Sequence, residues 1–533
     1  MSPAMWAYAE VDALWARFQP ETPYGRAAKV RRVPITDRAA LERLYDLTDH
    51  ARALLADLES DPIRRDRLTH HLKRLPRFPE TPQSLYDEVE IFQFKKFLFN
   101  HRCLLDRLTE GLRQAFGLAY LDPSLEGRLN QGRQSEESFY IADAYLPELA
   151  ETRRSLRAVD TGLQALRAQA EAHCMARWGF TFEGRAFVLL PRTRLGDPEA
   201  ARALLEVEPY DETQVCLRPR ATTEELRLAG HREELLARER ALETEVLAQL
   251  SAPLREALPA LQQQAQAIEA FDLALAGARL ALEANLVRPG LASASIVIEG
   301  GRHLPCEALC GELGTPYTPL EAIFDQGATV LFGSNMGGKT VVLKTLAFLQ
   351  LAAQMGLYVP ARRFKTRVFR HFHYMGEGRS REEARGLSGF GFEIRQFTEA
   401  WGDLEQDTLL LFDEFARTTS SQEAEALVSA ILEDLAARPS VVAAFSTHFR
   451  GIRRLPGVRY LRMGGLDRAR LAALEAPGTT LAERIRQIDH AMRFSLEPDA
   501  AGDTRSDALV VAERLGLPAT LARRAAAFLN ETN

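Results

Sequence analysis

GATVLFGSNMGGKTVVLKTLAFLQLAA, residues 327–353, is the most informative stretch of this sequence. An apolar run at 329–332 predicts a strand, a glycine-rich loop follows it, and apolar residues at helical spacing come next. The loop has the pattern G-x-x-x-x-G-K-[ST], in which backbone N–H groups and a helix N-terminus surround phosphate groups. The sequence therefore predicts a nucleotide-binding loop made of Gly333, Ser334, Asn335, Met336, Gly337, Gly338, Lys339 and Thr340.

Two residues of this loop carry distinct chemistry. Lys339 is expected to reach the β- and γ-phosphates, and the hydroxyl of Thr340 is placed to hold Mg²⁺. The predicted cofactors are therefore ATP and Mg²⁺, and the predicted activity is ATP hydrolysis.

A second apolar run, DTLLLFDEF at 407–415, ends in two acids. In phosphate-loop ATPases the first acid, here Asp413, completes the Mg²⁺ site, and the next, here Glu414, can activate the attacking water. Taken alone, such a run is also typical of a plain surface turn, but downstream of a phosphate loop the catalytic interpretation is favoured. A third run, SVVAAFSTHF at 440–449, predicts a neighbouring strand that ends at Thr447 and His448, where a polar side chain can sense the γ-phosphate.

Length and composition limit the class of protein. A chain of 533 residues predicts two to four domains. No apolar run approaches the roughly 18 residues of a membrane span, and the acidic N-terminus does not resemble a signal peptide. Five cysteines argue against a disulfide framework, so we expect a cytoplasmic protein with no membrane partner. The net charge of −6 gives no general electrostatic case for nucleic acid, although a local basic surface is compatible with it.

The pattern along the chain predicts a multidomain α + α/β fold. An N-terminal region covers 1–85, a mostly helical core or lever domain covers 86–292 with a short β insert at about 180–219, and a P-loop α/β ATPase domain covers 293–533. Helices are expected from Tyr86, over 135–176, and from Thr223 to about Leu286 with a break at Pro253. FTFEGRAFVLLP at 180–191 predicts a hairpin, and TQVCLRP at 213–219 predicts another strand. The long charged helix after Thr223 fits a coiled coil or lever and equally a solvated helix packed on its neighbours.

Five segments together resemble one family. GSNMGGKT, LLLFDEFARTTSS and FSTH are similar to the ATPase motifs of the MutS family of mismatch-repair proteins, and they occur in the family's order. GLSGFGFEIRQFTEA at 386–400 resembles its S-T-F-x-x-E segment, and RSDALVVAERLGLPATLARRAAAFL at 505–529 resembles its C-terminal dimerisation segment. Upstream, NLVRPGLASASIVIEGGRHLP at 285–305 resembles the family's passage from lever helices into the ATPase domain. The stretch TPYGRAAKV and the 180–191 segment resemble the second bacterial MutS paralogue, which handles recombination intermediates.

The resemblance implies a role for individual residues of an ABC-like P-loop domain. Asn335, Gly338, Lys339 and Thr340 would bind phosphate and Mg²⁺, with Asp413 completing the metal site. Glu414 would be the water-activating residue, and His448 the switch histidine. Ser388 matches the serine that reaches the γ-phosphate of the opposite subunit, which implies a homodimer or a heterodimer with a related subunit. Tyr317 lies where the family stacks an aromatic ring on adenine.

Several departures from the family pattern concern its partners. Arg417-Thr418-Thr419 lacks the usual glycine after arginine, and Ser506-Asp507-Ala508 replaces S-Y-G, so both put the dimer contacts in question. We expect no separate mismatch-reading domain ahead of the lever and no small nuclease-like domain after the ATPase domain.

These features leave two targets open. One is DNA, with the protein acting as an ATP-driven dimeric clamp in mismatch repair or recombination; Arg185, Arg192, Arg194, Arg218 and Arg220 are the candidate contacts, although a solvated face with salt bridges is slightly favoured for them. The other is a protein client, since a MutS-related subunit occurs among the reactivating factors of cobalamin-dependent lysine 5,6-aminomutase, and EIFQFKKFLFN at 90–100 resembles that group. A scaffold that does not hydrolyse ATP is disfavoured because Lys339, Thr340, Asp413 and Glu414 are all present.

Overall fold

A computed structural model describes residues 3–132, 135, 138–196, 198–291, 294–333, 337–376, 389–474, 480–499 and 507–531. Its contacts divide the chain into two compact units. Unit 1 comprises Met1–Arg67, Gln114–Phe116 and Ala267–Asn533, and unit 2 comprises Leu68–Arg113 and Gly117–Gln266. The expected combination of helical and α/β parts is confirmed, while the functional division at 85/86 and 292/293 stays a prediction.

A six-stranded sheet forms the centre of unit 1, in the order β12-β11-β6-β10-β9-β8. The five strands from β11 to β8 are parallel, and β12 pairs antiparallel with β11 at one edge. This confirms the α/β sheet expected in the C-terminal part. The strands are β6 (Gly327–Phe332), β8 (His371–Met375), β9 (Thr408–Asp413), β10 (Val441–Thr447), β11 (Val458–Leu466) and β12 (Met492–Pro498).

Helices cover both faces of this sheet because alternate strand residues point to opposite sides. Leu409, Leu411 and Val442 pack with α14 (Lys339–Gln354) in one core. Leu410 and Phe412 pack on the other side with α15 (Gly389–Trp401) and α16 (Ser421–Ala436). The central strands therefore consist mainly of buried apolar residues, as buried parallel strands usually do.

The N-terminal helices of unit 1 belong to the same core as α14. Met5 and Ala9 of α1 and Leu14 of α2 are fully buried in that cluster. A smaller antiparallel sheet, in the order β5-β4-β7, also contributes to it. The remaining elements of unit 1 are α1 (Pro3–Ala9), α2 (Asp12–Arg17), α3 (Pro23–Arg31), α4 (Arg38–Glu59), β4 (Ile296–Gly301), α13 (Leu304–Leu313), β5 (Leu320–Phe324), β7 (Arg363–Lys365), α17 (Arg468–Ala473), α18 (Leu481–Ala491), α19 (Asp507–Arg514) and α20 (Ala519–Glu531).

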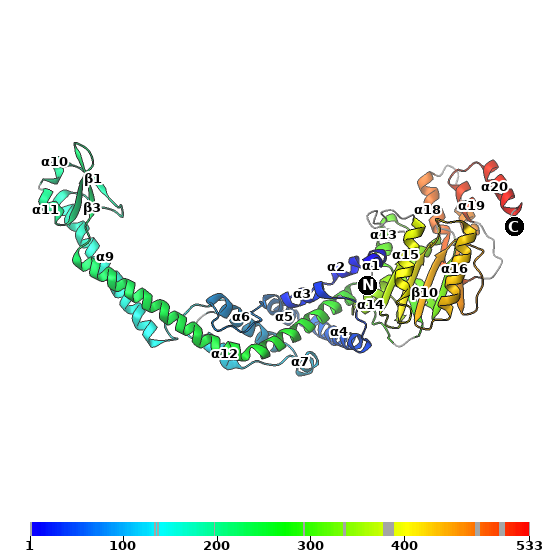
Figure 1. Ribbon diagram of the computed structural model, residues 1–533, viewed down its shortest axis with the longest axis horizontal. Coiled ribbons are helices and arrows are strands. Elements are labelled where there is room, and N and C mark those ends of the chain that lie inside the picture. Colours follow the sequence, from blue (N-terminus) through cyan, green and yellow to red (C-terminus); the bar gives the residue numbers. More distant parts are fainter. Residues whose placement is uncertain are drawn as a thin grey trace. The chain divides into compact units, whose positions relative to one another are not determined.

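Unit 2 is built from helices and a small antiparallel sheet in the order β1-β3-β2. Within it, α9 and α12 run side by side toward this sheet (Figure 1), joined by Arg153 to Glu239 and Glu243 at 2.7 Å each. The long charged helix α12 thus packs on α9 through charged side chains. The elements are α6 (Glu88–Leu105), α8 (Pro123–Leu129), α9 (Pro147–Trp178), β1 (Val188–Pro191), α10 (Arg192–Leu195), α11 (Pro198–Arg202), β2 (Leu205–Pro209) and β3 (Gln214–Pro219), while α5 (Pro62–Arg74), α7 (Glu110–Phe116) and α12 (Thr223–Glu283) have residues in both units.

Three local expectations were wrong. The 180–191 segment forms no hairpin, because only β1 is a strand there and it pairs with β3. The helix expected over 135–176 begins at Pro147. Helix α12 continues through Pro253, since buried Leu250, Leu254 and Leu258 hold both sides of the proline in place. None of the helices in the described ranges has the length and hydropathy of a bilayer-crossing segment.

The TPYGRAAKV stretch folds around a buried carboxylate. Asp272 accepts hydrogen bonds from the backbone N–H groups of Glu21 and Thr22 and from the hydroxyl of Thr22, at 2.7–2.9 Å. Thr22 in turn caps α3 by accepting from the N–H of Gly25 at 3.0 Å. Burial raises the pKa of Asp272, although these hydrogen bonds oppose the shift. A Cβ atom on Gly25 would lie 2.2 Å from Oδ2 of Asp272, so this position requires glycine.

Gly25→Ala is expected to lower the melting temperature of the protein, because the added methyl displaces Asp272 from its hydrogen bonds at a cost of about 1–3 kcal/mol. Gly111→Ala in α7 is the matched control, since nothing lies within 4 Å of its added carbon. Melting followed by circular dichroism checks both variants. Equal melting temperatures for the two variants would contradict the proposed crowding.

Candidate functional site

The glycine-rich loop leads from β6 into α14, as the sequence predicts. Lys339 is the first residue of α14, and its side chain is only 3% exposed. Its Nζ donates to the carbonyl of Gly333 at 2.7 Å and lies 3.9 Å from Oε1 of Glu414. Burial lowers the pKa of Lys339, while the charges of Glu414 and Asp413 act in the opposite direction. The lysine is thus held inside the loop, beside the acid that follows β9.

Two glycines of the loop have backbone angles and close neighbours that disfavour a side chain. Gly333 has φ 152° and Gly338 has φ 86°, values that L-residues rarely adopt. A Cβ atom on Gly333 would lie 3.1 Å from the side chain of Met463, and one on Gly338 would lie 3.1 Å from Phe494. The backbone can therefore turn closely enough for its N–H groups to face a bound anion.

Asp413 is the last residue of β9, and its carboxylate accepts hydrogen bonds from three hydroxyl groups. Its Oδ1 accepts from Oγ1 of Thr340 at 3.2 Å and from Oγ of Ser446 at 2.5 Å, and its Oδ2 accepts from Oη of Tyr8 at 3.2 Å. Ser446 lies directly opposite Asp413 in the parallel pairing of β10 with β9. Sheet register and the helix start together bring these oxygen atoms to one edge of the sheet.

The turn after Asp413 is strained. Glu414 and Ala416 both have positive φ, at 53° and 64°, which costs of order 1 kcal/mol or more for each non-glycine residue. Hydrogen bonds hold the turn: the N–H of Glu414 donates to the carbonyl of Ser446 at 3.1 Å, and that of Ala416 donates to buried Glu393 at 2.8 Å. The turn keeps the carboxylate of Glu414 only 16% exposed beside Lys339.

Tyr8 of α1 completes the site from the other end of the chain. Its hydroxyl donates to Asp413 and also lies 3.3 Å from the carbonyl of Thr340, while its ring stacks on Tyr374 at 4.0 Å. Burial, and next the Asp413 carboxylate, raise the pKa of Tyr8 well above its ordinary value, so the hydroxyl stays a donor. Sequence analysis missed this residue, because nothing local marks a tyrosine 405 positions away from its partner.

A pocket opens beside the loop, and Gly338, Val341 and Tyr317 are among the residues that line it. The Tyr317 hydroxyl accepts from the N–H of His303 at 2.7 Å, and burial raises its pKa to about 12. Phe494 is a second aromatic residue in the lining, which sequence analysis did not single out. The pocket is largely apolar and can receive a flat group attached to whatever the loop binds. Cys306, Cys310, Leu320, Val342, Thr345 and Met463 also line it.

The other predicted site residues are placed less centrally or not at all. His448 follows β10, is exposed, and has its ring 4.5 Å from that of Phe449. Gly337 is buried in the loop. Four predicted residues lie outside the described ranges: Ser334, Asn335, Met336 and Ser388.

Comparison with known proteins gives consistent matches. Residues 329–533 match the family model of MutS domain V. The chain is 31% identical over 304 residues to the DNA mismatch repair protein MutS of Paracoccus denitrificans, covering 56% of this chain and 33% of that protein. It is 30% identical over 315 residues to the MutS of Streptococcus gordonii, covering 58% and 35%. It is 29% identical over 343 residues to the endonuclease MutS2 of Halalkalibacterium halodurans, covering 63% and 38%.

The matched part of the chain thus spans about a third of the length of these relatives. It includes the glycine-rich loop, Asp413 at the end of β9, Glu414 after it and the strand that carries Ser446. Residues 329–533 thus match MutS domain V, and more than half of the chain is similar to MutS and MutS2 proteins.

Proposed function

We propose that this chain is a MutS-type P-loop ATPase that couples ATP hydrolysis to a change of state on DNA. The observation that carries the proposal is the convergence of Lys339, Thr340 and Asp413 at one edge of a parallel sheet. A buried ammonium group, a helix N-terminus and paired hydroxyl and carboxylate oxygens are the groups that a nucleotide triphosphate and its metal require.

The donor set fits Mg²⁺. Thr340 Oγ1 and Asp413 Oδ1 lie 3.2 Å apart and are hard oxygen ligands, the type that Mg²⁺ prefers. When bound, Mg²⁺ would neutralise charge on the β- and γ-phosphates. Lys339 would bind the same phosphates, together with the backbone of Gly333, Gly337 and Gly338. Ser334, Asn335 and Met336 are assigned to this loop by the sequence pattern alone.

Glu414 is the proposed general base. Its carboxylate is mostly buried, and the strained turn fixes its direction beside Lys339. A carboxylate in that position would accept a proton from the attacking water. His448 at the end of β10 is proposed as the switch histidine, and Tyr317 with Phe494 as the aromatic walls of the adenine pocket.

A dimer is proposed as the working form. Large apolar side chains of α19–α20 and the turn between them are exposed: Leu515 at 40%, Leu521 at 50% and Phe528 at 66%. Exposed apolar groups of this size favour an interface. Ser388 would then act on the γ-phosphate of the opposite subunit. The altered residues at 417–419 and 506–508 leave open whether that dimer is formed with an identical or a related subunit.

DNA is the favoured target because the relatives are named as mismatch repair proteins and a MutS2 endonuclease. Their names give no support to the alternative of an aminomutase reactivating factor. The 180–220 insert adds little to the DNA argument, since it contains six arginines and seven acidic residues. Arg185 and Arg218 pair with Glu183 and Glu208, each at 3.4 Å.

Lys339→Ala is expected to abolish nucleotide binding, because it removes the buried cation of the loop. Glu414→Ala should keep binding and slow hydrolysis by about 10²–10⁴-fold, the usual contribution of a general base. Equilibrium binding of a labelled nucleotide and single-turnover hydrolysis check the two variants. Lys365→Ala, on exposed β7, is the control expected to behave as the wild type. Full binding by Lys339→Ala would refute the site.

Tyr8→Phe is expected to raise the Mg²⁺ concentration for half-maximal hydrolysis by about 10-fold, because removing a group that orients a metal ligand usually costs 10–100-fold in affinity. Steady-state rates over a Mg²⁺ series at saturating ATP measure the shift. Tyr210→Phe, an exposed tyrosine of the insert, is the matched control. An unchanged Mg²⁺ dependence would limit Tyr8 to a packing role.

The target is tested by the ATPase rate with and without branched and duplex DNA at two salt concentrations. Stimulation that fades as salt rises is the expected result, because phosphate contacts release counterions. Lys339→Ala corrects for contaminating hydrolysis. A basal rate that no DNA changes would contradict the DNA proposal while leaving the ATPase assignment intact, and a search for a protein client would follow.

A further inference from the structure

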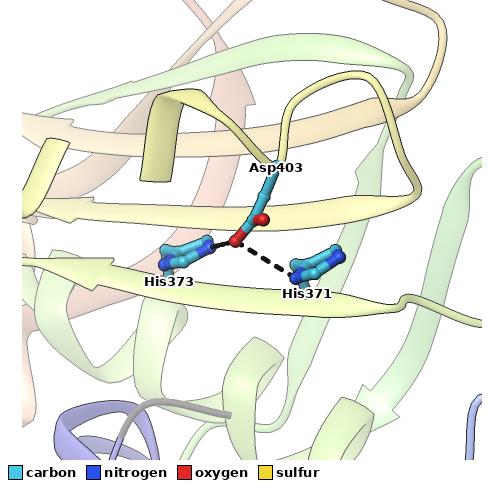
Figure 2. A group of neighbouring side chains, drawn as sticks. All are labelled: His371, His373 and Asp403. Carbon is cyan, nitrogen blue, oxygen red and sulfur yellow. Dashed lines mark hydrogen bonds and ion pairs between the residues drawn. The ribbon is translucent and has the colours of Figure 1, made fainter. Parts of the chain in front are cut away.

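Two histidines and an aspartate gather at β8, an edge strand of the six-stranded sheet. His371 and His373 lie on β8, and Asp403 lies in the turn after α15; the carboxylate sits between the two imidazoles (Figure 2). Oδ2 of Asp403 is 2.8 Å from Nε2 of His373 and 3.1 Å from Nδ1 of His371. Residues two apart on a strand share a face, so both imidazoles necessarily point the same way.

The spacing suits a shared cation. The three donor atoms all lie within 4.8 Å of one another. Ligands around a tetrahedral metal at about 2.0–2.1 Å lie roughly 3.3 Å apart. To admit an ion, the carboxylate oxygen would move away from each nitrogen by a few tenths of an ångström, and the two imidazole nitrogens, which lie within 4.8 Å of each other, would move closer together. The same groups also form a hydrogen-bonded His–Asp–His cluster without metal, which is the competing interpretation.

Neighbouring groups hold the imidazole of His371 and the turn of Asp403 in place, as the surroundings of a metal site usually do. Nε2 of His371 lies 3.4 Å from Oε1 of Gln406, so the ring nitrogen pointing away from Asp403 has an oxygen partner. Metal-bound histidines normally donate their second N–H to such an oxygen. The turn that carries Asp403 is fixed by Thr408, whose hydroxyl donates to the Asp403 carbonyl at 2.8 Å.

The position is accessible from solvent. The side chains of His371, His373 and Asp403 are 27%, 22% and 31% exposed, so an ion can enter without unfolding the sheet. Two imidazoles and one carboxylate suit Zn²⁺ and similar transition metals, whereas Mg²⁺ prefers oxygen ligands alone.

We propose that His371, His373 and Asp403 bind a divalent transition-metal cation of the Zn²⁺ class, with water in the fourth position. The site is separate from the Mg²⁺ site at Thr340 and Asp413. Such an ion would tie edge strand β8 to the turn that follows α15, in addition to the hydrogen bonds of His371 with Gln406 and with the carbonyl of Asp407.

The test is a Zn²⁺ titration of the full chain by calorimetry, without nucleotide and with excess Mg²⁺ to fill oxygen-only sites. One Zn²⁺ per chain is expected. His373→Ala and Asp403→Ala should each weaken binding by more than the 10–100-fold typical of losing an outer partner, and Gln406→Ala should fall within that range. His50→Ala, on the exposed side of α4, is the control expected to bind as the wild type.

Co²⁺ provides a measurement that needs no variant. The wild-type chain should show the d–d absorption of tetrahedral Co²⁺ without a thiolate charge-transfer band. No binding at micromolar Zn²⁺, or binding that survives both His373→Ala and Asp403→Ala, would overturn the proposal. So would a thiolate band that disappears in Cys306→Ser, because the cysteine pair would then be the site. Loss of hydrolysis with Zn²⁺ binding retained would bear on the ATPase proposal alone.

Discussion

The carboxylate of Asp413 joins three segments of unit 1 at the candidate nucleotide site. Three hydroxyl groups converge on it, from the start of α14, from the neighbouring strand β10 and from the N-terminal helix α1. The convergence requires the register of β9 and β10, in which Ser446 lies opposite Asp413. A slip of one residue would turn the carboxylate to the opposite face of the sheet, so the register of these two strands also fixes the site.

The first residues of the chain are part of the same arrangement. Met5 and Ala9 are buried with α14, and between them Tyr8 reaches the carboxylate. Glu10 also forms an ion pair with Lys344 of α14. A segment that sequence patterns assign to a separate N-terminal region therefore contributes both packing and a polar contact to the nucleotide-binding candidate. The packing of this N-terminal segment and the geometry of the site therefore depend on the same hydrophobic core.

The sequence predicts the features that depend on neighbouring residues, and it misses those that depend on contacts between residues far apart in the chain. The loop at Gly333–Thr340 and the acids at Asp413–Glu414 are local patterns, so they can be recognised from the sequence. Tyr8 carries no local signal. Ser446 and buried Glu393 lie in segments that resemble family motifs, but their contacts with Asp413 and Ala416 depend on pairing between distant segments, which no local pattern encodes. The same limit explains the errors in unit 2: β1 finds its partner in β3 rather than in its own neighbour, and packing carries α12 through Pro253. In each case tertiary contacts outweighed a correct local preference.

The two faces of strand β8 contact different groups of side chains. Tyr374 points to one side, where its ring lies against Tyr8, while His371 and His373 point to the other, toward Asp403. Adjacent residues share a peptide unit, so the backbone at His373 cannot be displaced without displacing the ring of Tyr374. The strand is therefore a common wall between the two polar clusters. If binding at one cluster changes the affinity of the other, linkage requires the effect to be equal in both directions.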